Sequence, residues 1–337
     1  EFKGEFKING LLRIDGKLMV TDFEPLTKDH LKRVIYGILS DRQKEKFEIE
    51  KELDFSLALS GMDRYRVNVH IQRGSVEAAF RRIPLFIPTM EELGLPPVMA
   101  DLARKKNGLV LVTGPTGTGK TTTLAAVINL INEERDNLIV MIEDPIEYMH
   151  FNKRSIIKQR EVFSDTNSFS EALKRSLRQD PDVIVVGEMR DLETISTALT
   201  AAETGHLVLA TLHTPDAPQT IQRIIDVFPP HQQTQVKLQL SSALQGVVSQ
   251  ILMPRADGQG RVLSTEVMIA TSAVRNLIWE QSIEQIPTAI QTGAAHGMHS
   301  MDKSLQALCR DGLVTFEDAL PYVKNVEEFR QMLNMKK

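Results

Sequence analysis

Residues 114–121 read Gly114-Pro115-Thr116-Gly117-Thr118-Gly119-Lys120-Thr121 and match the phosphate-binding pattern G-x-x-x-x-G-K-[ST] at every fixed position. An apolar run at 109–112 precedes this loop and predicts a short buried strand. Residues 122–131 follow it with apolar side chains at helical spacing, which predicts a helix. The local order is therefore strand, loop, helix.

The residue types in this loop suit a bound phosphate. Glycines let successive backbone N–H groups turn toward phosphate oxygens, and the positive end of the following helix faces the same anion. We expect Lys120 to bridge the β- and γ-phosphates and the Thr121 hydroxyl to ligate Mg²⁺. Residues 114–122, with Thr122 included, form the predicted ATP-binding site. The alternative is a glycine-rich turn that binds nothing.

Length and composition limit the class of protein. A chain of 337 residues can build two domains, each with its own core. Charged residues make up 25% and hydrophobic residues 42%, as in ordinary globular proteins. A net charge of −4 gives no general basic surface, so we expect no nucleic-acid partner.

The single cysteine, Cys309, excludes an internal disulfide and a zinc site built from protein cysteines. Its neighbours Leu305 and Leu308 favour a small buried side chain over a nucleophile. No apolar run reaches the ~18 residues of a membrane-spanning helix, and no secretory signal is visible. We therefore expect a cytoplasmic protein.

The first part of the chain predicts a small α/β domain. Residues 27–47 carry apolar side chains at helical spacing and predict one amphipathic helix. Residues 55–59 and 65–72 alternate between apolar and polar side chains and predict strands, and 76–82 is a third candidate strand.

Two prolines mark the domain boundary. Pro84 and Pro88 bracket a short extended connection, so we expect an N-terminal domain at 1–83, a linker at 84–88 and a second domain at 89–337. Thr89 and Glu92 form a capping-box pattern that predicts a short helix just after the linker.

The second domain alternates strands with helices. Near-continuous apolar runs at 138–142, 183–186 and 207–212 predict buried strands, and helical patterns at 169–178 and 192–203 lie between them. This order predicts a mostly parallel sheet covered on both faces. After Pro230 we expect mainly helix, with one strand near 262–269.

Acidic residues follow two of these strands. Glu143, Asp144 and Glu147 come just after the first strand, and Glu188 comes just after the next. Ligands bind at the carboxyl ends of parallel strands, so these acids should converge on the phosphates. One should hold Mg²⁺ directly or through water, and another should orient or deprotonate the attacking water. The alternative for Asp144 is a helix cap.

Two histidines bracket the strand at 207–212. His206 and His213 lie about 23 Å apart along an extended strand, so they cannot share a metal. His213 falls at the carboxyl end, where a group that senses the γ-phosphate belongs. For His206 a functional and a purely structural role remain equally open.

Together these segments resemble the secretion ATPase superfamily. The loop corresponds to its Walker A motif, 142–147 to its Asp box, 182–191 to its Walker B variant and 201–213 to its His box. A further segment resembles the partner-coupling motif of type IV pilus retraction ATPases, with tryptophan replacing the common arginine. Its residues are Ala273, Val274, Arg275, Asn276, Leu277, Ile278, Trp279 and Glu280.

The resemblance implies a hexameric ring of subunits, each with a PAS-like N-terminal domain and a RecA-like P-loop core that ends in a helical part. It also implies Glu147 as catalytic glutamate, Glu188 as the Walker B acid, and Arg66 and Arg81 as charge-stabilising arginines. Arg66 lies on the polar face of a predicted strand, and an arginine brought to a γ-phosphate raises the rate ~10³- to 10⁵-fold.

The resemblance further implies a motor that hydrolyses ATP with Mg²⁺ and drives pilus retraction and twitching motility through an inner-membrane platform protein. Such a motor is cytoplasmic and peripherally associated with that membrane. An assembly or type II secretion ATPase is an alternative, although the usual tetracysteine zinc module needs more than one cysteine. An accessory retraction paralogue, which is also a possible partner, a nucleic-acid translocase and a nucleotide-gated scaffold without turnover are the others.

Overall fold

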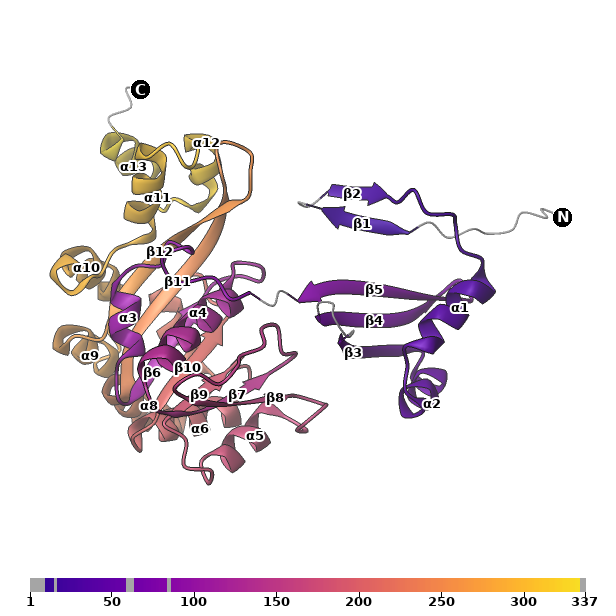
Figure 1. Cartoon of the computed structure of the whole chain (residues 1–337). Coiled ribbons are helices and arrows are strands. Elements are labelled where there is room, and N and C mark those ends of the chain that lie inside the picture. Colours follow the sequence, from indigo (N-terminus) through magenta and orange to yellow (C-terminus); the bar gives the residue numbers. More distant parts are fainter. Residues whose placement is uncertain (1–9, 15–16, 59–63, 84–85, 334–337) are drawn as a thin grey trace. The chain divides into compact units, whose positions relative to one another are not determined.

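The computed structural model describes residues 10–14, 17–58, 64–83 and 86–333. The chain divides into two compact units, Glu1–Phe86 and Ile87–Lys337 (Figure 1). The division between them falls among the residues expected to form the linker.

The N-terminal unit combines a hairpin, two helices and a three-stranded sheet. The hairpin joins β1 (Leu11–Ile14) to β2 (Lys17–Val20). The sheet is antiparallel in the order β3-β4-β5. Its strands are β3 (Glu52–Ala58), β4 (Arg64–Gln72) and β5 (Ser75–Ile83). Apolar side chains of the two helices and of this sheet form one buried cluster.

The single helix expected at 27–47 is wrong, because the structure has two helices there. α1 (Lys28–Gly37) begins after its cap Thr27, and α2 (Asp41–Glu50) begins after Ser40. The Ser40 side chain accepts a hydrogen bond from the Gln43 backbone, and the Gln43 side chain accepts one from the Ser40 backbone. This capping box starts a new helix inside a run that is periodic throughout. Leu59, expected in β3, lies outside the described residues.

The second unit is built on a seven-stranded sheet in the order β12-β11-β6-β10-β9-β7-β8. All neighbouring strands are parallel except β12, which is antiparallel to β11. The strands are β6 (Gly108–Thr113), β7 (Leu138–Glu143), β8 (Ile156–Glu161), β9 (Val183–Val186), β10 (Leu207–Leu212), β11 (Leu244–Pro254) and β12 (Arg261–Ile269). The predicted α/β class with a large, mostly parallel sheet is confirmed.

Helices cover both faces of this sheet (Figure 1). One face packs against α3 (Val98–Ala103) and α4 (Lys120–Glu134). The other packs against α5 (Phe169–Ser176), α6 (Leu192–Glu203), α7 (Ala217–Asp226), α8 (Pro230–Ala243), α9 (Ser272–Trp279) and α10 (Ile286–Thr292). Neighbouring residues of β6 alternate between the two clusters, so the sheet is buried from both sides.

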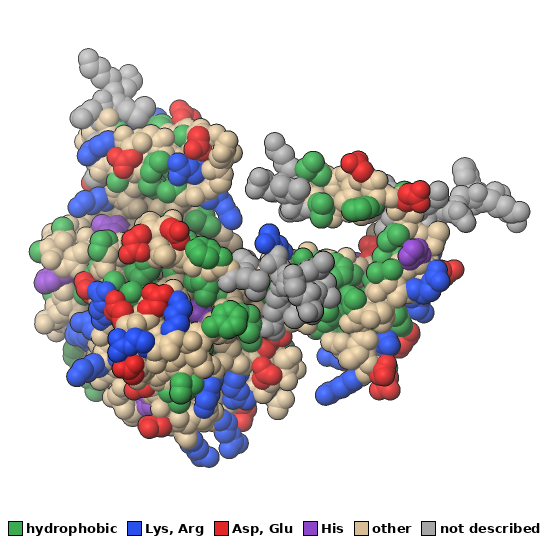
Figure 2. Space-filling model, viewed as in Figure 1, with side chains coloured by type: hydrophobic (Ala, Val, Ile, Leu, Met, Phe, Trp, Pro, Cys, Tyr) green, Lys and Arg blue, Asp and Glu red, His purple; other side chains and the backbone are tan. Residues whose placement is uncertain are grey.

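The C-terminal helices form a smaller cluster at one end of the long β11–β12 pair. They are α11 (Met301–Arg310), α12 (Phe316–Ala319) and α13 (Val326–Met332), with the 3₁₀ turn η3 (Leu320–Tyr322) before α13. On the visible face of this unit, Lys and Arg side chains are mixed with Asp and Glu (Figure 2). None of the helices in the described ranges is long and apolar enough to cross a membrane.

Two expectations for this unit are wrong. The region after Pro230 contains β11 as well as β12, so it has two strands where one was expected. The capping box of Thr89 and Glu92 is present, but the following residues form turns and regular helix begins only at α3. Gly94, with φ of +66°, and Pro96 stop a helix from continuing out of that turn. Strand β8 was not anticipated.

Candidate active site

The phosphate loop joins β6 to α4, and its glycines have backbone conformations that other residues rarely adopt. Gly114 has φ of +144°, and a Cβ there would lie 2.3 Å from the Gln250 carbonyl oxygen. Gly119 has φ of +85° and forms the N-cap of α4. The open N-terminus of α4 therefore follows directly from the loop, as an anion site requires.

Lys120 lies in the first turn of α4 with its ammonium group inside the loop. Its Nζ donates to the carbonyl oxygens of Gly114 at 2.7 Å and Pro115 at 3.0 Å. Burial lowers the pKa of Lys120, while the negative charges of Glu188 and Glu147 act in the opposite direction. Two of the predicted acids are thus close enough to act on the cation that would meet the phosphates.

Gln250 supports the loop from β11 and was missed by sequence reasoning. Its side-chain nitrogen donates to the Thr118 carbonyl oxygen at 2.6 Å, and the residue is completely buried. Its Oε1 has no hydrogen-bond partner among the described residues. No motif marks this glutamine, so only the pairing of β11 with β6 reveals it.

Glu188 follows β9 and is the centre of a charged cluster. Its Oε1 lies 2.5 Å from Arg190 Nε and 3.1 Å from His213 Nε2. Burial raises the pKa of Glu188, but hydrogen bonds and charge from Arg190 and His213 outweigh this, so the net pKa lies below the usual value. The carboxylate is therefore ionised at neutral pH, as a metal-holding acid must be.

The segment after β7 places its acids differently. Glu143 is buried and accepts from Gln159 Nε2 at 2.9 Å, whereas Asp144 is exposed. Glu147 is partly buried, and its charge acts on Lys120. Of these three acids, Glu147 is therefore the one that faces the phosphate loop.

Tyr148 and His150 follow Glu147 in the same segment. The Tyr148 hydroxyl lies 3.1 Å from Thr122 Oγ1, which ties this segment to α4. His150 is buried, and neither ring nitrogen has a partner in the described ranges. It lines a cavity of about 30 Å³ with Thr121 and Glu143 among its neighbours. Burial, followed by the charge of Lys153, lowers the pKa of His150 to about 4.

The two predicted histidines have different surroundings. His213 follows β10, and its Nδ1 lies 3.4 Å from Thr116 Oγ1 and 3.5 Å from Lys120 Nζ. It therefore joins the phosphate loop to Glu188. His206 precedes β10, where its Nδ1 lies 3.0 Å from the Ala201 carbonyl oxygen at the end of α6. The structure brings His213 to the phosphate loop and leaves His206 at the opposite end of the strand.

Arg66 and Arg81 lie in the N-terminal unit, directly opposite each other on β4 and β5. Arg66 is partly buried and Arg81 is exposed. Within the described part of that unit, neither guanidinium has a hydrogen-bond or ion-pair partner. Like charges placed directly across a pair of strands repel each other, so this pair favours an anion between or beside them.

The segment resembling the retraction motif forms α9. Val274 and Ile278 are buried against the core, and Trp279 is 43% exposed. Arg275 Nη1 donates to the carbonyl oxygens of Ser241 and Ser242, both at 2.5 Å, at the end of α8. Arg275 therefore caps α8, and Trp279 is the motif's large exposed apolar side chain.

Magnesium fits this site only together with a nucleotide. In the described ranges, no group of three or more His, Cys, Asp or Glu side chains could hold a metal ion. The hydroxyl of Thr121 and the carboxylate of Glu188 are hard oxygen donors of the kind that Mg²⁺ prefers, and Mg²⁺ commonly completes its shell with phosphates and water.

A mostly parallel sheet with a phosphate loop after β6 and acids after β7 and β9 defines a P-loop ATPase. Residues 89–320 match the family model described as type II/IV secretion system protein. The chain belongs to this family.

Its relatives are similar over nearly their whole length. The chain is 48% identical over 319 residues to the type IV pilus retraction ATPase PilT of Pseudomonas aeruginosa, covering 95% of this chain and 92% of that protein. It is 40% identical over 324 residues to the type IV pilus ATPase PilU of the same organism, covering 96% and 85%. A crystal structure of the pilus retraction motor PilT with bound ADP superposes with a TM-score of 0.90 at 47% identity, covering 96% and 93%.

Proposed function

We propose that this protein is a motor that hydrolyses ATP with Mg²⁺ and drives retraction of a type IV pilus, and with it twitching motility. The observation that carries the proposal is the similarity to a pilus retraction ATPase over 95% of the chain. The contacts among Lys120, Glu188 and His213 support it, because they bring a cation, an ionised acid and an imidazole to one phosphate loop.

Each group in the core has a chemical role in this proposal. Residues 114–122 bind the phosphates, with Lys120 on the β- and γ-phosphates. Thr121 and Glu188 hold Mg²⁺, directly or through water, and the bound metal neutralises developing phosphate charge. Glu147 orients the attacking water and accepts its proton. His213 senses the γ-phosphate and, through its contact with Glu188, links the phosphate to the acid.

The N-terminal unit, which we propose to be PAS-like, supplies the remaining charges. Arg66 and Arg81 approach the γ-phosphate when this unit moves about the linker at 84–88. Their unpartnered guanidiniums then offset the charge of the transferring phosphoryl group, an effect of ~10³- to 10⁵-fold in rate. Hydrolysis in this scheme depends on where the N-terminal unit stands.

The motor acts as a homohexameric ring at the cytoplasmic side of the inner membrane. Residues 273–280 contact the pilus platform protein there, and the exposed indole of Trp279 suits such a contact. A paralogous retraction ATPase is a further partner.

Imaging of surface pili after deletion of the gene tests the proposal. A retraction motor predicts excess pili that no longer retract, whereas loss of pili would show an assembly motor. Normal retraction, lost only when a paralogue is also deleted, would show an accessory role, which the 40% identity to PilU makes the second candidate. Turnover that rises several-fold with DNA, with pili unaffected, would show a translocase.

A further inference from the structure

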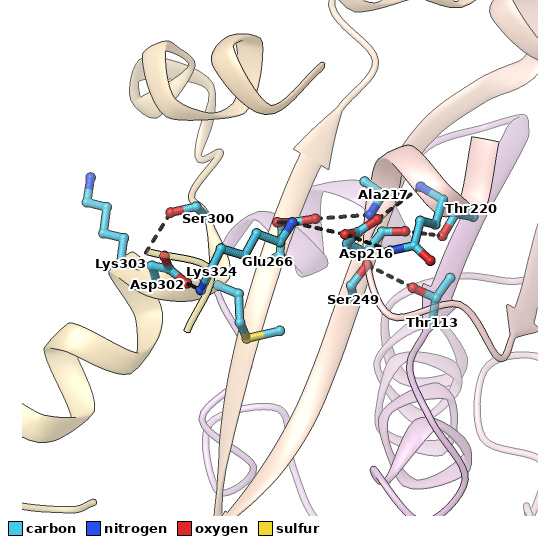
Figure 3. A network of polar contacts seen from close by, with 12 residues as sticks. Thr113, Asp216, Ala217, Thr220, Ser249, Glu266, Ser300, Asp302, Lys303 and Lys324 are labelled. Carbon is cyan, nitrogen blue, oxygen red and sulfur yellow. Dashed lines mark hydrogen bonds and ion pairs between the residues drawn. The ribbon is translucent and has the colours of Figure 1, made fainter. Parts of the chain in front are cut away.

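A buried charge cluster lies outside the phosphate site and joins the C-terminal helices to the core (Figure 3). It contains Asp216, the N-cap of α7; Glu266 on β12; and Lys324, which precedes α13. Lys324 Nζ lies 2.9 Å from Asp216 Oδ2 and 3.8 Å from Glu266 Oε2. Asp216 is 8% exposed and Glu266 is 3% exposed, so both carboxylates depend on partners within the protein.

The two carboxylates organise the first turn of α7. Asp216 Oδ1 accepts from the Gln219 backbone nitrogen at 2.9 Å, and Glu266 Oε1 accepts from the Ala217 backbone nitrogen at 3.0 Å. On the other side, the backbone nitrogen of Lys324 donates to Asp302 Oδ1 at 3.2 Å, at the start of α11. Lys324 therefore connects the start of α7 with the start of α11.

The charges in this cluster make Lys324 hard to replace. Burial raises the pKa of Glu266, and the nearby Asp216 adds to this effect while Lys324 opposes it. Burial lowers the pKa of Lys324, but Glu266 and Asp216 outweigh it and the net pKa is raised. Without the ammonium group, two buried carboxylates would face each other unpaired, which pushes them apart.

Asp216 is three residues beyond His213 in the chain. His213 contacts Glu188 at 3.1 Å, and between them Thr214 Oγ1 lies 2.6 Å from Thr220 Oγ1 in α7. The segment 213–216 is thus held at one end by the phosphate site and at the other by Lys324. A shift of Asp216 would be passed along three residues to the imidazole.

We propose that Lys324 is a positioning residue that holds Asp216 and thereby keeps His213 against Glu188, so that ATP turnover depends on the C-terminal segment α11–α13. The inference rests on the proposed function, because it takes ATP hydrolysis at Lys120 and Glu188 as the reaction. Lys324 lies beyond residues 89–320, which the family model matches.

The test uses the purified full chain and compares Lys324→Met with Lys324→Arg. We expect Lys324→Met to lower kcat about tenfold while KM for ATP and the affinity for a fluorescent ADP stay within about twofold. Lys324→Arg should restore at least half of the wild-type kcat, because it keeps a cation. Lys303→Met is the matched control, since this exposed lysine of α11 is removed from the same segment and should leave kcat unchanged.

A second variant separates positioning from folding. Lys324→Met with Glu266→Gln removes one charge of each sign and should melt close to the wild-type temperature, yet its kcat should stay low. A wild-type kcat in either the single or the double variant would overturn the inference. So would loss of ADP affinity in step with kcat, or failure of Lys324→Arg to restore turnover. A wild-type protein without ATPase activity would instead overturn the proposed function.

Discussion

The phosphate loop and the arginine pair on β4 and β5 are two parts of one proposed site, and their charges are treated in opposite ways. In the core, Lys120 is held by loop carbonyl oxygens, and Glu188 is held by Arg190 and His213. In the N-terminal unit, Arg66 faces Arg81, and the described residues of that unit supply no counter-charge. The core is arranged in advance for phosphate, whereas the arginine pair gains its counter-charge only from outside its own unit.

The largest expected effect comes from breaking the prearranged side. Glu188→Gln keeps the shape of the side chain but removes the charge that pairs with His213 and Arg190. We expect turnover to fall at least about 10³-fold while ATP binding is retained. Phosphate release and binding of a fluorescent nucleotide measure the two effects. Glu193→Gln removes an exposed acid of α6 and is the control; unchanged phosphate release from Glu188→Gln would mean that the protein is a scaffold.

The next effect tests the side without partners. Arg66→Ala and Arg81→Ala should each lower turnover about 10²-fold, because each removes a charge meant for the transition state. The N-terminal unit itself should lose no stability and gain up to about 0.5 kcal/mol, since a repulsion across the strands is relieved. Steady-state kinetics and thermal melting check both signs. Arg42→Ala, on the exposed face of α2, is the control; a stability loss with full activity would contradict this account.

The smallest effect concerns the core without nucleotide. His150 has a pKa of about 4 in the folded protein and near 6.5 when unfolded, so the unfolded state binds more protons between these values. Its contribution is fully present above pH ~6.5 and falls by about 3 kcal/mol as the pH drops toward 4. His150→Gln should lack this dependence.

Urea unfolding from pH 7 to pH 4, followed by the fluorescence of Trp279, measures the change in the core unit. Trp279 is the single tryptophan of the chain, so it reports on this unit alone. Equal pH slopes for the wild type and His150→Gln would show that the buried imidazole is not the cause.

The sequence predicts the centre of the core better than its later part. The loop at 114–121 has fixed residues, and β7, β9 and β10 are short apolar runs bounded by polar ends, so strand and helix are told apart by length. β11 follows α8 without a break in pattern. Its apolar residues continue the helical spacing of α8 at Leu240, Ala243, Leu244, Val247, Val248 and Ile251. A central strand buried on both faces has no alternation, so this segment resembles helix.

The candidate site divides in the same way. Lys120, Glu147, Glu188 and His213 were predictable because each follows a strand whose carboxyl end meets the phosphates. Gln250 and Lys324 were not, because they contact Thr118 and Asp216 across 132 and 108 residues of chain and carry no motif. Arg66 and Arg81 were named through family resemblance, and only the strand register shows that they face each other.

The support that β11 gives to the phosphate loop has a consequence for synthesis of the protein. In the finished sheet β6 lies between β10 and β11, and Gln250 braces Thr118 from 132 residues later. A ribosome that has just added Thr121 has completed the whole motif, but β6 is still an edge strand until β11 leaves the exit tunnel. A nascent chain that stops before residue 244 therefore carries every letter of the nucleotide motif without the strand that braces it.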